Sequence, residues 1–370
     1  MASAAEDSPG RPDLRHERFE AHYHGDVDFE REELRSEAEM ALRRQDAEAA
    51  EASTSGYCSA LVSERTAPAA PSAPAAPACP AASGSPSAES RRWEAFHGEV
   101  HGAGEFFKDR RYLVREFYEL KTGVPGPPPR WTMDDITQRL PAAAVDVIEV
   151  GCGTGNSCIP VLGANPLARV CACDFSESAV AITASRAERL GIGSGSEPAA
   201  GAGAGAGALG LGELPAGRRF HAAVGDPVTA PLVPASAAFL DPTCPGYGAA
   251  MLIFTLSAVD PAHHGLVMRR VADSLRPGGF VAFRDYGSWD MAMLRFPGAQ
   301  RVADRLYVRQ DGTLAYFFEL EDVQRLADHA GLRVEELRWC RVANRNRRDN
   351  TDMRRIFVHA KLRRPLPTDF

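Results

Sequence analysis

The stretch VDVIEVGCGTGNS, residues 145–157, decides the fold class of this chain. Its first six residues are mostly apolar, which predicts a buried strand. GCGTGNS then supplies the glycines of a tight turn, and CIPVLGANP (158–166) opens like a helix. We therefore predict a strand, a turn and a helix in immediate succession, in a pattern that starts at Ala142.

The same alternation continues toward the C-terminus. We expect a strand at 169–175, a helix at 176–191, a strand at 249–259, a helix at 263–279 closed by Pro-Gly-Gly, and a strand at 280–287. Strands that alternate with helices predict a parallel sheet covered on both faces. YVRQDGTLAYFF (307–318) has an Asp-Gly turn between apolar runs, which predicts an antiparallel hairpin at a sheet edge. The fold class is therefore α/β and doubly wound.

The glycine turn indicates a nucleotide-like cofactor. Asp174 ends the next predicted strand 23 residues after Gly151, where a carboxylate can accept hydrogen bonds from both ribose hydroxyls. A dinucleotide and S-adenosylmethionine both fit this layout. Dinucleotide folds favour GxGxxG, but this chain has GxGxG, with Asn156 at the position of that motif's third glycine. We therefore predict S-adenosylmethionine, with Asp226 placed to accept from the adenine amino group; a glycine-rich turn without a ligand is the alternative.

Length and composition exclude several classes of protein. The 370 residues suffice for one large domain or two small ones, and no stretch approaches the roughly 18 apolar residues of a membrane helix. The eight cysteines contain no CxxC pair, so we expect neither a zinc ribbon nor a disulfide scaffold. His263-His264 has no third ligand nearby in sequence, so no metal site is predicted. The start resembles no targeting peptide, and we expect a cytoplasmic protein, with or without a nuclear pool.

Low-complexity segments divide the chain. We expect an acidic, partly helical arm at 1–65, a disordered linker rich in Pro, Ala and Ser at 66–90, and a catalytic body at 91–365 with RNA-binding elements. Within that body, 191–217 contains GAGAGAGALGLG and predicts an expanded surface loop. Residues 28–51 combine strong helix formers with mixed charge, which favours a solvated helix over a binding module.

A series of motifs identifies a family. WEAF (93–96), EFFKDR (105–110), ACDFS (172–176), MLIFTLSAV (251–259), FRDYG (283–287) and LYVRQDGT (306–313) follow one another along the chain. Together they resemble the eukaryotic tRNA N3-methylcytidine methyltransferases, the methyltransferase-like 2, 6 and 8 group. The resemblance implies a Rossmann-like class I methyltransferase fold, with a mostly parallel seven-stranded sheet and an antiparallel edge hairpin. It also implies formation of N3-methylcytidine at position 32, in the anticodon loop of a subset of tRNAs.

The resemblance implies a cofactor site. Trp93 would cover the cofactor, Gly151 would lie against its methionine part, and Ile253 would line the pocket beside the sulfonium. The cofactor-binding residues predicted in all are Trp93, His97, Gly151, Gly153, Asn156, Asp174, Phe175, Ser176, Asp226 and Ile253. Two positions depart from the family, since His97 stands where tyrosine is usual and Pro227 where leucine is usual.

Asp285 is the predicted catalytic residue. Cytidine N3 already carries an in-plane lone pair, so its methylation requires no strong general base. The methylated base is cationic when first formed, and a facing carboxylate would stabilise that developing charge. Asp285 ends a predicted strand, and catalytic groups gather at that end of open α/β sheets. The alternative is a structural ion pair with Arg284 or another basic residue.

Basic and aromatic residues form the predicted RNA surface. Aromatic side chains stack on splayed bases and cations hold phosphates, although one of Phe106 and Phe107 is expected to be core. Residues 338–364 contain ten basic and two acidic side chains, so this segment is strongly basic, whereas 1–64 contain 16 acidic and 7 basic ones. The predicted RNA-binding residues are Phe106, Phe107, Lys108, Arg110, Arg284, Arg309, Arg345, Arg347 and Arg354, with Arg348 and Arg355 as further phosphate candidates.

Rival functions and partners stay open at this stage. A protein or small-molecule acceptor would keep the cofactor but would not need the basic C-terminal segment. A noncatalytic RNA-binding scaffold would be expected to lose cofactor residues that this chain retains. Family members often obtain tRNA identity from a partner, such as a seryl-tRNA synthetase or an accessory tRNA-binding protein, and others require a prior modification. The acidic arm repels phosphate, which favours partner docking or regulation over RNA anchoring.

Overall fold

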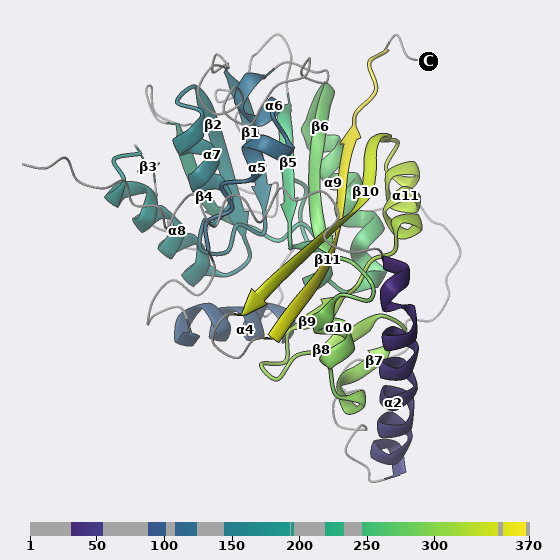
Figure 1. Cartoon of the computed structure of the whole chain (residues 1–370). Coiled ribbons are helices and arrows are strands. Elements are labelled where there is room, and N and C mark those ends of the chain that lie inside the picture. The colour runs from purple at the N-terminus through teal and green to yellow at the C-terminus, as the bar shows by residue number, and fades with distance from the viewer. Residues whose placement is uncertain are drawn as a thin grey trace, which may run out of the picture.

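Eight strands form the central sheet in the order β10-β11-β6-β5-β1-β2-β4-β3 (Figure 1). The computed structural model describes residues 31–54, 88–100, 108–123, 144–192, 194–195, 219–232, 246–346 and 351–367. From β6 to β3 neighbouring strands pair in parallel, while β11 pairs antiparallel with both β6 and β10. The predicted α/β fold with an antiparallel edge is confirmed, and the two-residue β3 is a strand beyond the predicted seven.

Strands β1, β2, β5 and β6 overlap the segments predicted as strands, whereas β4, β10 and β11 were not assigned from the sequence. The strand bounds are β1 (Val145–Val150), β2 (Ala168–Asp174), β3 (Ser194–Gly195), β4 (Phe220–Val224), β5 (Tyr247–Ile253), β6 (Leu275–Tyr286), β10 (Arg333–Asn346) and β11 (Thr351–Arg363). Two boundaries differ from the prediction. The strand expected at 249–259 ends at Ile253, and a 3-10 turn follows at Leu256–Ala258. The LRPGG segment, expected to close a helix, begins β6 because Leu275 pairs in parallel with Tyr247 of β5.

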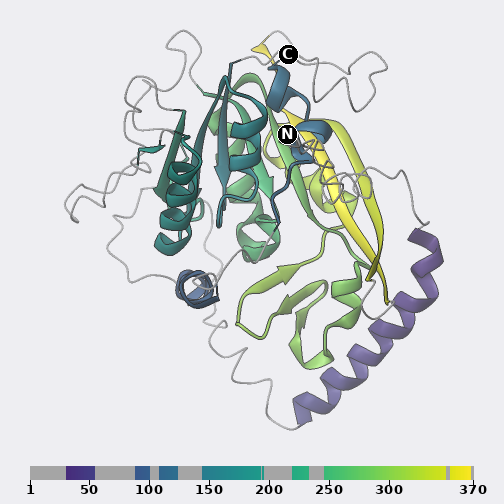
Figure 2. The ribbon, with the colours of Figure 1, turned by 60° about the vertical axis from the view of Figure 1, so that its left-hand side comes forward.

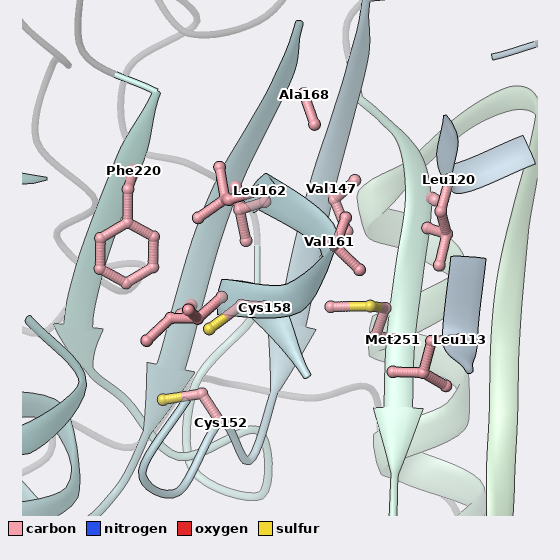
Figure 3. Close-up of a cluster of buried hydrophobic side chains, with 14 of the residues drawn as sticks. Leu113, Leu120, Val147, Cys152, Cys158, Val161, Leu162, Ala168, Phe220 and Met251 are labelled. Carbon is pink, nitrogen blue, oxygen red and sulfur yellow. The ribbon is translucent and has the colours of Figure 1, made fainter. Parts of the chain in front are cut away.

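Helices cover both faces of the sheet. They are α5 (Leu113–Glu116), α6 (Glu119–Thr122), α7 (Cys158–Ala164), α8 (Glu177–Arg189), α9 (His264–Ser274) and α11 (Leu320–His329), while α4 (Ala88–Ala95) lies below the sheet and contacts α8 (Figure 1). Helices α5 to α8 contribute to one buried cluster, which includes Leu113, Val147 and Met251 (Figure 3). Helices α9 and α11 contribute to the cluster on the other face, which also contains Cys171 and Cys173 of β2. The parallel strands are therefore buried on both sides.

The predicted Asp-Gly hairpin forms, but outside the central sheet. Strands β8 (Leu306–Val308) and β9 (Leu314–Tyr316) pair antiparallel, and β7 (Arg301–Ala303) completes a separate sheet, here called the small sheet. The expectation that this hairpin forms the edge of the central sheet is therefore wrong. Long strands β10 and β11 hydrogen-bond beside β6 instead and provide the antiparallel edge.

Helix α2 (Arg35–Thr54) packs against this small-sheet region rather than standing in solvent. It follows a short 3-10 turn, η2 (Arg31–Leu34), and lies along α10 (Met291–Arg295) and the turn η9 (Gly298–Gln300). Figure 2 shows the purple helix beside the green small sheet, below the central sheet. The expectation of a fully solvated helix is therefore wrong. In the part of the chain that the structure describes, no helix has the length and apolar content needed to cross a membrane.

Candidate active site

The turn after β1 has a backbone conformation that favours glycine. The φ angles of Gly151, Gly153 and Gly155 are +72°, +51° and +81°, in the left-handed region. A Cβ at Gly151 would overlap the side chain of Thr255. The Gly151 N–H donates to the Cys173 carbonyl over 2.8 Å, which holds the turn against the end of β2. The close approach of Thr255 and the positive φ together explain the glycine at 151.

Buried polar side chains hold the turn from behind. The Glu149 carboxylate accepts from the Cys158 N–H over 2.9 Å and is 1% exposed. Burial raises the pKa of Glu149 to about 7, although the hydrogen bonds from Cys158 oppose the shift. Arg186 of α8 donates to the Thr154 carbonyl over 2.5 Å and forms an ion pair with Asp109 at 2.8 Å. The turn is thereby fixed between β1, α7 and α8.

Asp174 presents a carboxylate beside the turn. Its two oxygens accept from the Gly153 N–H over 2.9 Å and from the Ser176 N–H over 3.0 Å. Burial raises the pKa of Asp174 to about 6, and these backbone donors limit the rise. A carboxylate has about four lone-pair sites, so two backbone bonds leave acceptor capacity for ligand hydroxyls.

A cavity of about 480 Å³ opens beside these groups, within the usual range of about 300–1,000 Å³ for small-molecule sites. Nine of the ten predicted cofactor residues line it: Trp93, His97, Gly151, Gly153, Asn156, Asp174, Phe175, Asp226 and Ile253. These lining residues combine a close backbone approach, a ribose-type carboxylate and apolar walls. They fit S-adenosylmethionine.

Ser176 is the exception among the predicted cofactor residues. It does not line the cavity. Its side chain is the N-cap of α8, where it accepts from the Ala179 N–H over 3.1 Å, and its hydroxyl donates to Glu94 over 2.7 Å. Ser176 is also fully buried. Its prediction as a cofactor contact is therefore wrong, because the helix cap uses its side chain.

An aromatic pair closes one side of the cavity. The rings of Trp93 and His97 stack with centroids 5.6 Å apart, and both side chains line the cavity. Burial lowers the pKa of His97 to about 4, with a smaller opposing effect of Glu94. His97 is therefore neutral at pH 7 and offers a flat imidazole surface rather than a positive charge.

Asp285 lies directly behind the cavity wall. It is fully buried, and its carboxylate accepts from the N–H groups of Ser257 and Tyr286, each over 2.9 Å. Ser257 and Tyr286 both line the cavity, whereas Asp285 does not. Burial raises the pKa of Asp285 to about 6; the hydrogen bonds and the charge of Arg309 act in the opposite direction. The carboxylate is therefore largely ionised at pH 7.

Arg284 does not pair with Asp285. It is 1% exposed and forms an ion pair with Glu116 of α5, which also accepts from His359 over 3.1 Å. Two predictions are affected. The structural alternative for Asp285, an ion pair with Arg284, is not observed, and the prediction that Arg284 contacts RNA is wrong because its guanidinium is buried.

The opposite side of the cavity carries polar residues from the turn between β8 and β9 and from the end of β6. We call Tyr286, Arg309, Asp311 and Thr313 the substrate wall; all four line the cavity. Thr313 donates to the Asp311 carboxylate through its N–H over 2.9 Å and its hydroxyl over 2.6 Å. Arg309 donates to the Leu314 carbonyl and lies 5.9 Å from the centre of the Tyr286 ring. These contacts fix the conformation of the hairpin turn, so that the Arg309 guanidinium and the Asp311 carboxylate both lie at the cavity.

The other predicted RNA contacts have different surroundings. Arg110 lines the cavity, donates to the Ser157 hydroxyl over 3.0 Å and lies over the Phe254 ring. Lys108 is exposed, and Arg354 forms an ion pair with Glu37 of α2. Phe106, Phe107, Arg347 and Arg348 lie outside the described residues, and the side chain of Arg345 is not described. Arg355 pairs with Asp290 at 2.8 Å, which occupies its guanidinium.

Sequence reasoning missed several lining residues. Asp311 and Thr313 belong to the quoted LYVRQDGT motif, and Phe254 follows the predicted Ile253 directly. The motifs are visible in the sequence, but the sequence does not show which of their side chains face the cavity. Phe254 also has a φ of +58°, which ends β5 and turns the chain at the cavity. Among the described residues, no group of three or more His, Cys, Asp or Glu is arranged to hold a metal ion.

The fold and this cavity together define an S-adenosylmethionine-dependent methyltransferase. The model of the methyltransferase domain family matches residues 127–337. Among solved structures, the 1,6-didemethyltoxoflavin-N1-methyltransferase of Burkholderia thailandensis is 17% identical, with a TM-score of 0.43 over 75% of this chain and 87% of that chain.

Curated relatives define the family further. The tRNA N(3)-methylcytidine methyltransferase Mettl2 of Drosophila melanogaster is 32% identical over 74% of this chain and 71% of its own length. The tRNA N(3)-cytidine methyltransferase METTL2 of Xenopus tropicalis is 31% identical over 76% of this chain and 79% of its own. Human METTL6, of the same kind, is 28% identical over 74% of this chain and 80% of its own. The chain belongs to the tRNA N3-methylcytidine methyltransferase family.

Proposed function

We propose that this chain transfers a methyl group from S-adenosylmethionine to N3 of cytidine 32, in the anticodon loop of a subset of tRNAs. The observation that carries the proposal is the placement of Asp285, ionised and buried between two cavity-lining residues, Ser257 and Tyr286. Membership of the tRNA N3-methylcytidine methyltransferase family supports the same acceptor.

The reaction moves charge rather than a proton. S-adenosylmethionine supplies an electrophilic methyl group; the N3 lone pair forms the new N–C bond, and the electrons of the broken S–C bond stay on sulfur. The positive charge therefore passes from sulfur to the cytosine ring. Asp285 lies behind the cavity wall rather than against the ring, so its negative charge acts across Ser257 and Tyr286, whose backbone N–H groups hold it in place. A fixed negative charge at that position favours the positive charge on the ring as it develops.

The shape of the site supports an unpaired base. In a duplex, cytidine N3 is occupied by base pairing, so the base has to leave the stack before it can react. The substrate wall offers the Tyr286 ring for stacking and the Arg309 guanidinium for a phosphate or carbonyl oxygen. An anticodon-loop cytidine meets these requirements without melting a helix.

Partners and compartment belong to the same proposal. A seryl-tRNA synthetase or an accessory tRNA-binding protein would select among tRNAs, and the cytoplasm, with or without a nuclear pool, is the expected location. The rival acceptors are a protein or a small molecule, and the rival class is a noncatalytic RNA-binding scaffold.

The test is methyl transfer from labelled S-adenosylmethionine to total tRNA, with nucleoside mass analysis of the product. N3-methylcytidine is expected, and its position is read by primer extension. Asp285→Asn should lower kcat about a hundredfold with the Kd of S-adenosylmethionine unchanged, while Asp273→Asn, on the exposed face of α9, serves as the matched control.

Each outcome separates the hypotheses. Cofactor binding without transfer to tRNA, even after addition of cell extract as a source of partners, would contradict the proposed acceptor. Labelling of protein or small molecules in that extract would favour the rival acceptors. Normal turnover by Asp285→Asn would remove Asp285 from the mechanism.

A further inference from the structure

Helix α2 buries a polar side chain against the small-sheet region. Gln45 is 0% exposed. Its amide group donates to the carbonyls of Met293 over 2.9 Å and Phe296 over 3.0 Å, and its carbonyl accepts from the Tyr307 hydroxyl over 2.8 Å. Both amide hydrogens are therefore used. A buried polar group whose partners are all in place selects one arrangement of the elements that it joins.

The contact is close along the rest of the helix. Gly298, in the turn after α10, lies so near α2 that a Cβ there would overlap the backbone oxygen of Gln45. The Gly298 N–H donates to the Glu48 carboxylate over 2.6 Å, and Arg44 donates to the Leu294 carbonyl over 2.9 Å. Backbone groups that end α10 are thus hydrogen-bonded by α2 side chains.

The start of the helical segment is held at a second point. The Arg31 guanidinium lies between two indoles, 4.0 Å from the centre of Trp289 and 4.4 Å from that of Trp339. It also donates to Glu319 over 2.8 Å and to Ser288 over 3.0 Å. Leu34 and Ala38, between Arg31 and Gln45, are buried as well. One face of the segment is therefore held against the catalytic body from Arg31 to Glu48.

The small sheet needs such support. Each of its strands has three residues, and short isolated strands are marginal in water without packing against another element. Tyr307 is fully buried and stacks on Phe296 with centroids 4.7 Å apart. Tyr307 also meets Phe317 edge to face at 5.6 Å, and Phe317 lies 5.8 Å from Tyr286 of the substrate wall. A packed path thus runs from Gln45 to the cavity.

The charge of the helical segment argues against direct RNA contact. Residues 31–54 contain seven acidic and four basic side chains, and an acidic surface repels phosphate. Two of these carboxylates face arginines of the catalytic body, in the pairs Glu37 with Arg354 and Asp46 with Arg301. The segment binds the protein rather than the substrate.

We infer that helix α2 supports the substrate wall from outside the cavity and that Gln45 is a positioning residue, which sets the place of Arg309, Asp311 and Thr313 through Tyr307. This inference rests on the proposed function for its kinetic consequence. For this part of the chain it differs from the expectation of partner docking or regulation that was drawn from the acidic sequence. Among the described residues, Gln45 has no hydrogen bond to the cofactor half of the cavity. The affinity for S-adenosylmethionine should therefore not depend on Gln45.

The test compares full-length variants. Gln45→Met keeps the side-chain volume and removes all three hydrogen bonds, and it should raise the KM for tRNA about tenfold with the Kd of S-adenosylmethionine unchanged. Tyr307→Phe removes one of the three bonds and should raise this KM less. The double variant should resemble Gln45→Met alone, because the hydroxyl has already lost its acceptor.

Two further measurements separate position from stability. Val323→Ala serves as the control for stability, because Val323 of α11 is part of the hydrophobic core. It should lower the melting temperature without raising the KM for tRNA. Hydrogen exchange in 306–316 should accelerate in Gln45→Met and stay unchanged in β1 and β2, a readout that requires no methyl transfer. If exchange rises while the wild type fails to methylate tRNA, the proposed function fails and the inference about α2 stands. Unchanged exchange and unchanged KM in Gln45→Met would overturn the inference.

Discussion

On the cofactor side of the cavity, the groups that face the ligand follow directly from strand ends, apart from Trp93 and His97, which lie in the helical segment before the sheet. The glycine turn follows β1, Asp174 ends β2 and Asp226 lies just beyond β4. The substrate wall is different, because Arg309, Asp311 and Thr313 belong to a separate small sheet that packs against α2, more than 250 residues earlier in the chain. The two sides of the cavity thus differ in the sequence separation between the residues that face the ligand and the residues that hold them in place.

This difference has a functional consequence. Strand ends in a parallel sheet are fixed by the sheet itself, so the cofactor half is rigidly placed by the core. The substrate wall depends on contacts between elements that are only marginally stable alone. Changes on the cofactor side should therefore alter cofactor affinity, and changes around the wall should alter the KM for tRNA. The following predictions test that separation, from the largest effect to the smallest.

Gly151→Val should weaken S-adenosylmethionine binding about a hundredfold or more, because a branched side chain is strained at positive φ and overlaps Thr255. Isothermal titration measures the Kd. Gly163→Ala is the matched control, since Gly163 of α7 has open space around its Cβ position. Equal loss of affinity in both variants would mean that the effect comes from the fold and not from the turn.

Lower pH should reduce kcat through Asp285. Its pKa is raised to about 6 by burial, so the charged form dominates above this value and is lost as the pH falls through it. Between pH 7 and pH 5 kcat should fall about tenfold. Asp174 also has a pKa of about 6, so the Kd of the cofactor is measured separately over the same range. If the residual kcat of Asp285→Asn does not change with pH, Asp285 is the group that titrates. If kcat of this variant still falls between pH 7 and pH 5 as in the wild type, another group is responsible.

Arg309→Ala should raise the KM for tRNA about fivefold and reduce the slope of log KM against log salt by about one. Cofactor affinity should stay the same. The matched control is Arg325→Ala, on the exposed face of α11, where the arginine pairs with Asp322. A shift of cofactor Kd in Arg309→Ala would show that the two sides of the cavity are not independent.

Glu37→Gln should tighten tRNA binding about twofold. The substitution releases Arg354 from its exposed ion pair and removes one negative charge near it. Stability should change by less than about 1 kcal/mol, as is usual for surface pairs. Filter binding at several salt concentrations measures the effect, with Glu39→Gln on the same helix as the control. Weaker binding in Glu37→Gln would place the tRNA away from Arg354.

Nine of the ten cofactor-binding residues predicted from the sequence line the cavity, and their contacts with the cofactor stay a prediction. Each feature of the cofactor side lies within a short contiguous stretch, in which apolar runs, glycine spacing and a terminal carboxylate are visible together. The error at Ser176 came from the same locality, because a serine at the start of a helix has two uses and sequence alone does not distinguish them.

The errors elsewhere have a common cause. Arg284 belongs to a recognised motif, but its partner Glu116 is 168 residues away, and no local pattern indicates that it is buried. The helical segment looked solvated because the residues that face the catalytic body include the polar Arg31, Gln45 and Glu48, of which only Gln45 is fully buried. Those polar side chains hydrogen-bond backbone groups of the catalytic body or lie over its indole rings. The sequence of the helix alone does not indicate these distant partners.

The sequence by itself determined the α/β fold, the glycine turn, the cofactor carboxylate and the family motifs. All of these depend on backbone geometry and apolar periodicity over short stretches. Only the tertiary structure decided which arginines face the cavity, where the predicted hairpin packs and what α2 does. Those outcomes depend on contacts between segments far apart in the chain, where the burial of a charge is set by a distant partner rather than by its neighbours in sequence.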